Sequence, residues 1–125
     1  MSLAMEQVAR EDVVILTLGG RLTHRESDDF FDRIRALGAA GHRKVVLDLR
    51  NVSYVDSAGL GAIVGGYTSL AKQGGTVKLF NPNKRTVELL QMTQLNTLFE
   101  VFEDLRAALD SFSPRAKSSS STSSG

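Results

Sequence analysis

The chain has 125 residues, of which 42% are hydrophobic, so it is long enough for one domain with a packed core. Its formal net charge of +1 gives no electrostatic reason to expect direct nucleic-acid binding, and the lack of cysteine excludes disulfides and thiolate metal sites. No apolar run approaches the ~20 residues that a membrane span needs, and no secretory signal is visible, so we expect a soluble cytoplasmic protein without membrane insertion.

Strands are predicted where β-branched and aliphatic residues run together. They occupy residues 13–18, 44–49 and 76–80, with a short strand within 98–102 and a candidate antiparallel edge strand at 5–9. Gly19–Gly20 predicts a turn directly after the first of the strong strands.

Helices are predicted between these strands. Thr23 and Glu26 have the spacing of a capping box, and the apolar residues that follow recur on one helical face, at Phe30, Ile34 and Leu37. A second helix runs from Ser57 to about Gln73. A third is expected to be capped by Asn81 with Pro82 at its first position, and a fourth lies within 103–109.

The alternation of strands and helices predicts the fold class. It favours a small α/β sheet with parallel pairings, right-handed crossovers and helices on one or both faces. Residues 1–110 are predicted to form this single domain. Residues 111–125, which include a long run of serine, have little to bury and are predicted to be a disordered tail.

The helix after Ser57 has an unusual composition on the face expected to point outward. Its core side carries large apolar residues, whereas Ala58, Gly61, Ala62, Gly65 and Ser69 cluster on the opposite side. Each helical glycine costs roughly 1 kcal/mol relative to alanine, so something should compensate for several of them. Either another protein docks on this small, uncharged face, or the helix packs closely against its own domain on both sides.

Three interpretations of Ser57 in the stretch VDSAGLGA are open. The serine could cap the helix, act as a nucleophile, or be modified by another protein. A nucleophile is disfavoured because the only histidines are His24 and His42 and no G-x-S-x-G motif is present. No phosphate-binding loop and no paired metal-ligand spacing occur, so no cofactor or metal is expected. A phosphate at the helix start would be accommodated locally and would add negative charge beside Asp56.

The segment from VVLDL through VDSAGL, GGTVKLF and the NP…V..LL helix resembles the STAS domain of bacterial anti-sigma-factor antagonists. The segment GRLTHRES is similar to the family's G-x-L region, and the resemblance runs from about Val13 to Leu109. It implies a mixed sheet of four or five strands with about four helices, which lie on one side of the sheet.

The resemblance also implies a function without catalysis. Family members with this motif bind an anti-sigma factor that is itself a serine kinase, and the unphosphorylated form thereby frees the sigma factor. The kinase uses ATP to phosphorylate the motif serine, here Ser57, and a serine phosphatase reverses the reaction.

Carried over residue by residue, Ser57 is the phosphoacceptor and Asp56 is the acid that helps the partner to recognise it. The remaining positions expected to contact the partner are Ala58, Gly59, Gly61, Ala62 and Gly65 on the helix, with Thr23 and His24 at the rim. Two positions depart from the family pattern. Ala58 replaces a common second hydroxyl, which leaves Ser57 as the unambiguous acceptor. Thr23–His24 stand where many members carry an acid, which concerns partner choice.

Two other functions remain open at this point. The chain could be a non-switching STAS scaffold subunit of a lipid-transport ATPase or a signalling complex, in which Ser57 is only a cap. It could also be an enzyme or a small-ligand sensor, although the sequence contains no phosphate loop.

Overall fold

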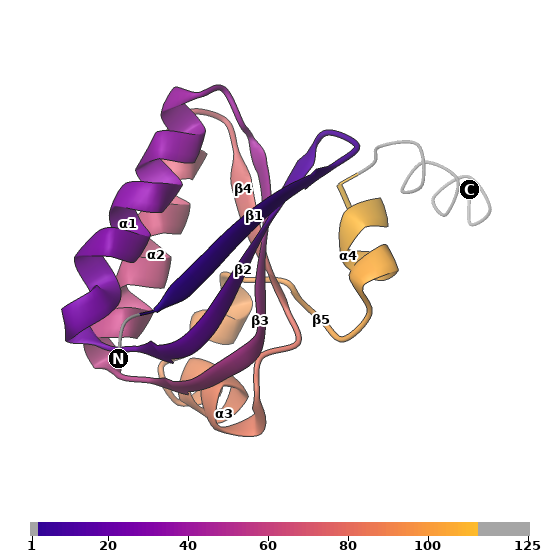
Figure 1. Ribbon diagram of the computed structural model, residues 1–125. Helices are drawn as coiled ribbons and strands as arrows, with labels where there is room; N and C mark the ends of the chain where they lie inside the picture. Colours follow the sequence, from indigo (N-terminus) through magenta and orange to yellow (C-terminus); the bar gives the residue numbers. More distant parts are fainter. Residues whose placement is uncertain (1–2, 113–125) are drawn as a thin grey trace.

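A computed structural model describes residues 3–112 of the chain (Figure 1). Its strands are β1 (Ala4–Arg10), β2 (Val13–Leu22), β3 (Lys44–Val55), β4 (Thr76–Phe80) and β5 (Val101–Phe102). Its helices are α1 (His24–Ala39), α2 (Ser57–Ala71), α3 (Lys84–Met92) and α4 (Leu105–Asp110), with a short 3-10 turn at Leu95–Thr97. The predicted tail lies outside the described residues from position 113 onward.

The five strands form one mixed sheet in the order β1-β2-β3-β4-β5. β1 pairs antiparallel with β2, which confirms the predicted edge strand, and the other three pairings are parallel. The predicted turn at Gly19–Gly20 is wrong, because β2 continues to Leu22 and pairs there with an equally extended β3. Register shifts and the φ of +111° at Gly20 accommodate this extension, which bends the strand without ending it.

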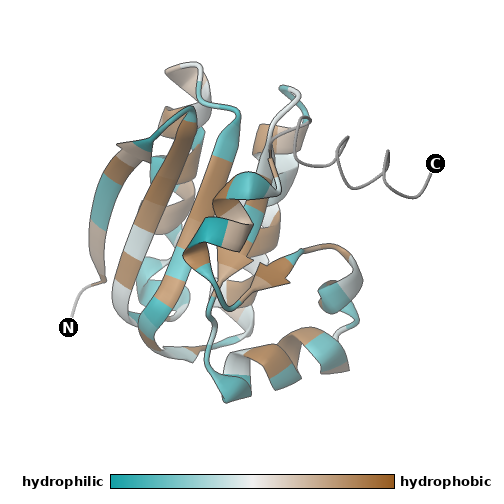
Figure 2. Cartoon of the chain, turned by 90° about the vertical axis from the view of Figure 1, so that its right-hand side faces the viewer, coloured by the Kyte–Doolittle hydropathy of each residue, from teal (hydrophilic) through white to brown (hydrophobic). Residues whose placement is uncertain are grey.

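Successive side chains of a strand point to opposite faces of the sheet, and they form two separate hydrophobic clusters, one on each face. The larger cluster lies beneath α1 and α2, where Phe30 and Ile34 meet Ile63 and the inward residues of β2 and β3. The smaller one lies beneath α4 and contains Ala108 and Leu109. Figure 2 views the α4 face, where the central strands are largely hydrophobic. The expectation that the helices lie on one side therefore holds for α1 and α2 but not for α4 (Figure 1).

The capping residues at the start of α1 agree with the prediction, whereas the cap of α3 differs from it. Thr23 and Glu26 form the predicted capping box, in which both the backbone N–H and the hydroxyl of Thr23 donate to Glu26 Oε1, at 3.1 and 2.6 Å. For α3 the predicted cap is wrong: Asn83, not Asn81, accepts from the Thr86 N–H at 2.8 Å. Asn81 has a φ of +55° and belongs to the turn before the helix.

No helix within residues 3–112 is long and apolar enough to cross a membrane.

Candidate functional site

The starts of α1 and α2 lie side by side at one end of the sheet, and Asp56 joins them. Its Oδ1 accepts from the Gly59 N–H at 2.7 Å, which caps α2, and its Oδ2 accepts from the His24 N–H at 3.1 Å, at the first residue of α1. The Asp56 N–H in turn donates to the Leu22 carbonyl at 3.2 Å. One carboxylate thus satisfies unpaired N–H groups at two helix N-termini, where negative charge is favoured.

Hydrogen bonding sets the charge state of this carboxylate. Partial desolvation acts to raise the pKa of Asp56, but the N–H bonds from Gly59 and His24 outweigh it and hold the pKa below its ordinary value. The capping carboxylate of Glu26 also has a lowered pKa, chiefly because the Thr23 hydroxyl donates to it. Both acids are therefore anionic at neutral pH.

The interpretation of Ser57 as the helix cap is wrong. Asp56 has the extended backbone of an N-cap (φ −93°, ψ −177°), and Ser57 is the first residue within α2. Both residue types are favoured caps, so composition alone could not separate two neighbours. Because Asp56 carries out the capping, the Ser57 side chain is exposed at the helix start, where its chemistry can change without removing the cap.

Gly59 is buried and serves packing at the same joint. A Cβ added there would lie 2.1 Å from the carbonyl oxygen of Leu22, far inside contact distance. The end of β2 therefore lies directly against the first turn of α2, which only glycine permits. A residue buried in this way offers no surface to a partner, so Gly59 supports the site from within and does not belong to its contact surface.

The predicted small-residue face forms a shallow groove between α1 and α2, which we call the α1/α2 groove. Its volume is about 300 Å³, and it is lined by Ser27, Asp28, Phe31, Ala58, Gly61, Ala62 and Gly65. The structure thus brings together four of the predicted helix positions, with Thr23 and His24 at the adjoining start of α1. Thr23 is half-buried and His24 is exposed.

Only part of that face is outward, so the alternative of close packing within the domain holds for part of it. A Cβ at Gly65 would lie 3.3 Å from the Phe31 ring, and one at Gly66 would lie 3.2 Å from Ile34. The close approach of α1 accounts for both of these glycines. Gly61 differs, because a Cβ there would meet nothing within 4 Å. Within the described residues, no neighbouring contact therefore offsets the cost of having glycine at position 61 of the helix.

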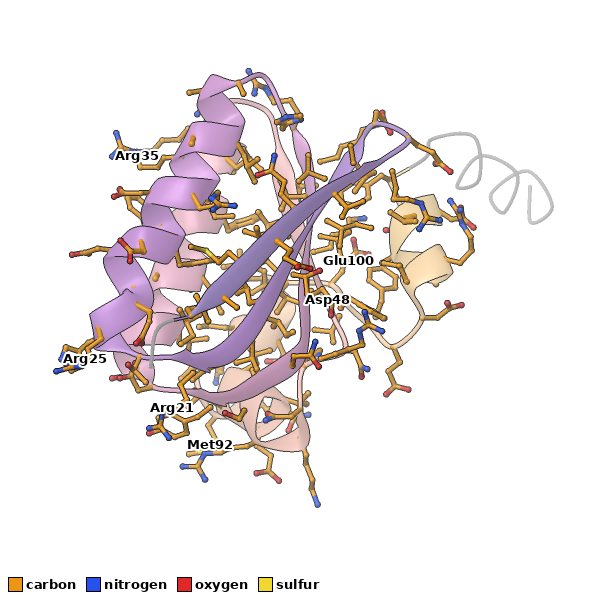
Figure 3. The ribbon with its side chains drawn as sticks, viewed as in Figure 1. Arg21, Arg25, Arg35, Asp48, Met92 and Glu100 are labelled. Atoms are coloured by element: carbon orange, nitrogen blue, oxygen red, sulfur yellow. The ribbon has the colours of Figure 1, made fainter. Side chains whose placement is uncertain are left out.

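A second groove borders Ser57 on the opposite side, and the sequence reasoning missed it. This α2/α3 groove has a volume of about 420 Å³ and is lined by Tyr54, Val55, Asp56, Ser57, Arg85, Glu88, Leu89 and Met92. Its α3 residues follow the i, i+3, i+4, i+7 spacing of one helical face, a signal that was available in the sequence. Met92 is 80% exposed, and it lies at the same end of the molecule as Arg21 (Figure 3).

Among residues 3–112, no three side chains of the His, Cys, Asp or Glu type gather in a way that could hold a metal ion. What the end of the sheet offers is an exposed hydroxyl between two grooves. That arrangement is suited to recognition and modification by another protein.

The family model for the STAS domain matches residues 4–108. The chain is 31% identical over 107 residues to the anti-sigma F factor antagonist of Paenibacillus polymyxa, covering 83% of this chain and 90% of that protein. The crystal structure of TM1081, a candidate anti-sigma factor antagonist of Thermotoga maritima, superposes with a TM-score of 0.81 at 26% identity, covering 86% and 92% of the two chains. Unphosphorylated SpoIIAA, at 20% identity and a TM-score of 0.68, covers 89% and 99% and shares the fold.

The fold and the Asp56–Ser57 joint define a STAS-type domain, a mixed five-stranded sheet with a helix start exposed at its end. The chain belongs to the STAS domain family. Relatives that it matches over most of their length are named anti-sigma factor antagonists.

Proposed function

We propose that this chain is an anti-sigma-factor antagonist whose binding is switched by phosphorylation of Ser57. In its unphosphorylated form it binds an anti-sigma factor that is also a serine kinase, and the sigma factor is released. The chain is the substrate in this scheme and performs no catalysis. The names of its relatives support the antagonist class.

The observation that carries the switch is the exposed position of Ser57 at the first residue of α2. Asp56 caps the helix, so the Ser57 hydroxyl is not needed for folding. Ala58 and Gly61 follow it on the exposed edge of the α1/α2 groove, where a partner's backbone can approach closely. A group added to Ser57 would stand at the border of that contact.

The chemistry of the switch is a phosphoryl transfer and its reversal by hydrolysis. The γ-phosphoryl group of ATP passes to Ser57 Oγ, ADP leaves, and the hydroxyl proton goes to a base of the kinase. The product carries about −1.5 to −2 charge at neutral pH, next to the Asp56 carboxylate. A partner surface fitted to a neutral serine then meets repulsion and added bulk. A serine phosphatase restores the hydroxyl by attack of water and releases inorganic phosphate.

The test is phosphorylation by the serine kinases encoded near this gene. Each is incubated with the protein and ATP, and the modified residue is located by mass spectrometry, with Ser57→Ala as the control. We expect one phosphate, on Ser57, and loss of the complex once it is present. If none of these kinases modifies Ser57, the proposed switch is wrong.

The scaffold alternative predicts a different response to Ser57→Asp. An acid at the first helical residue suits the helix dipole, so folding should persist under either function. Under the switch, the added charge should weaken partner binding by at least about 30-fold, since like charges at an interface cost several kcal/mol. Thr68→Asp, an exposed position near the other end of α2, is the matched control and should change binding little. Equal binding by both variants would favour the scaffold.

A further inference from the structure

Two arginines lie against the Tyr54 ring, which lines the α2/α3 groove, and one of them, Arg85, lines the groove itself. The Arg21 guanidinium lies 4.8 Å from the centre of the Tyr54 ring, and that of Arg85 lies 5.3 Å from it. These are cation–π distances, so both guanidiniums are held against the same ring. Arg21 comes from the end of β2 and Arg85 from the first turn of α3, so two separate elements deliver positive charge beside the Ser57 joint.

Neither of these guanidiniums forms an ion pair within the described part of the chain. Arg50 and Arg106, by contrast, are paired with carboxylates. Stacking on a ring leaves the N–H edge of a guanidinium available. That edge donates two parallel hydrogen bonds to a phosphate, the geometry for which arginine is better suited than lysine.

Ser57 and Arg85 line the same groove, whose volume of about 420 Å³ lies within the range of small-ligand sites. Asp56 also lines it, but the two oxygens of its carboxylate accept from the N–H groups of Gly59 and His24. The remaining acid in the groove is Glu88, one turn along α3 from Arg85. Arg85 thus shares the groove with one carboxylate that is not held at the helix starts, and Arg21 adds a second positive charge on the Tyr54 ring.

We propose that Arg85, with Arg21 beside it, receives the phosphate carried by Ser57, so that the modified side chain turns into the α2/α3 groove and does not project into solvent. This inference rests on the proposed modification of Ser57. The modified side chain would lie in the groove and cover its apolar lining residues Leu89 and Met92. Phosphorylation would then remove a contact surface as well as add charge to one.

The test uses the full chain with phosphoserine introduced at position 57 by genetic encoding, so that no kinase is required. The second pKa of the phosphate is measured by ³¹P NMR titration, in the wild-type background and in Arg85→Gln. An ordinary phosphoserine has a second pKa near 6, and a nearby guanidinium lowers it by favouring the dianion. We expect Arg85→Gln to raise this pKa by about 0.5 unit, which is about a 3-fold gain in proton affinity. The double change Arg21→Gln/Arg85→Gln should raise it further.

Two matched variants control for general charge effects. Arg35→Gln removes the same charge from the far part of α1, away from Arg21 and Arg25 (Figure 3), and should leave the pKa within about 0.1 unit. Glu88→Gln removes the opposing acid from the groove and should lower the pKa. His24 and Arg25 at the start of α1 and the Asp56 carboxylate also act on the phosphate, but they are retained in every variant, so their contribution cancels.

A second measurement tests contact directly. The Nε–H resonance of Arg85 should shift on comparing phosphoserine with serine at position 57, and that of Arg35 should not. Equal pKa values in Arg85→Gln, Arg35→Gln and the unchanged phosphoprotein, with no Arg85 resonance shift, would overturn the proposal.

The two proposals fail in distinguishable ways. If no kinase modifies Ser57, the switching function falls, while the encoded phosphoserine still reports whether the arginines hold a phosphate. If the phosphate shows no dependence on arginine, the groove proposal falls, and phosphorylation can still act by repulsion at the α1/α2 groove.

Discussion

Replacing Asp56 with alanine should destabilise the domain more than the loss of any ordinary surface acid. The change removes the N-cap of α2, which is worth about 1 kcal/mol, and a second charge-assisted bond to the His24 N–H at the start of α1. Because the Asp56 side chain is only half-buried, we take the low end of the range for the bond to His24. We therefore expect the free energy of unfolding to fall by about 2 kcal/mol in total. For a domain of this size the melting temperature should fall by roughly 8–15 °C.

Urea unfolding followed by far-UV circular dichroism at pH 7 measures this loss, with Asp29→Ala as the control. Asp29 is an exposed acid of α1, and its removal should change stability by less than about 0.5 kcal/mol. Asp56→Asn should lie between the two, since asparagine is a good cap but presents an N–H₂ group to one of the two donors. If Asp56→Ala costs no more than Asp29→Ala, the carboxylate does not join the two helices as described.

The stabilities of the wild-type protein and of Asp56→Ala should converge in acid. The pKa of Asp56 is lower in the folded state than in the unfolded chain, where an aspartate titrates near 3.9. Its stabilising contribution is therefore fully present above about pH 4 and is lost as the pH falls through the folded pKa. The stability gap between the wild-type protein and Asp56→Ala should narrow below pH 4. A gap that stays constant down to pH 3 would show that ionisation contributes nothing.

Three further changes have definite expectations. Gly59→Ala places a methyl group against the Leu22 carbonyl and should cost at least about 3 kcal/mol in urea unfolding, whereas Gly61→Ala meets open space and should gain up to about 1 kcal/mol. If the α1/α2 groove docks a partner, Gly61→Ala should weaken that binding while it stabilises the helix, and unchanged binding would remove Gly61 from the interface. Lys78→Ala removes the ammonium group that donates to the Ser111 hydroxyl and lies 4.4 Å from the centre of the Phe112 ring. Hydrogen exchange of the backbone amides in α4 should therefore become about 10-fold faster. An unchanged exchange rate would show that Lys78 does not stabilise α4.

The strands and helices were largely predictable because their signals are local. The apolar runs at 13–18, 44–49 and 76–80 are all strands, and the Thr23–Glu26 box starts α1 as its spacing indicated. The extensions of β2 and β3 were not predictable in this way. Gly20 has no strand preference of its own and becomes extended because the two strands pair with each other.

The residues of the candidate site could be predicted from the sequence, but which of them are covered by a neighbouring helix could not. A helical-wheel argument placed Gly61 and Gly65 on the same outward face, yet it could not foresee where α1 would cross α2. The Phe31 ring covers Gly65 and leaves Gly61 open, which is a long-range packing result. The α2/α3 groove combines Tyr54 from a strand with Arg85 from a later helix, and only tertiary structure brings such residues together.

The order of residues at the joint separates folding from modification. Had Ser57 been the cap, a phosphate on its oxygen would have displaced the acceptor that closes the first turn, and a change in partner binding would have been accompanied by a change in stability. Asp56 instead closes that turn and bonds α1 as well, while Ser57 stands one residue further on with its side chain exposed. A charge added at Ser57 therefore acts on whatever contacts the grooves beside it, whereas the loss of Asp56 acts on the domain itself. Ser57→Asp and Asp56→Ala, one residue apart, should for this reason fail in different ways: the first should stay folded but bind its partner more weakly, whereas the second should be destabilised.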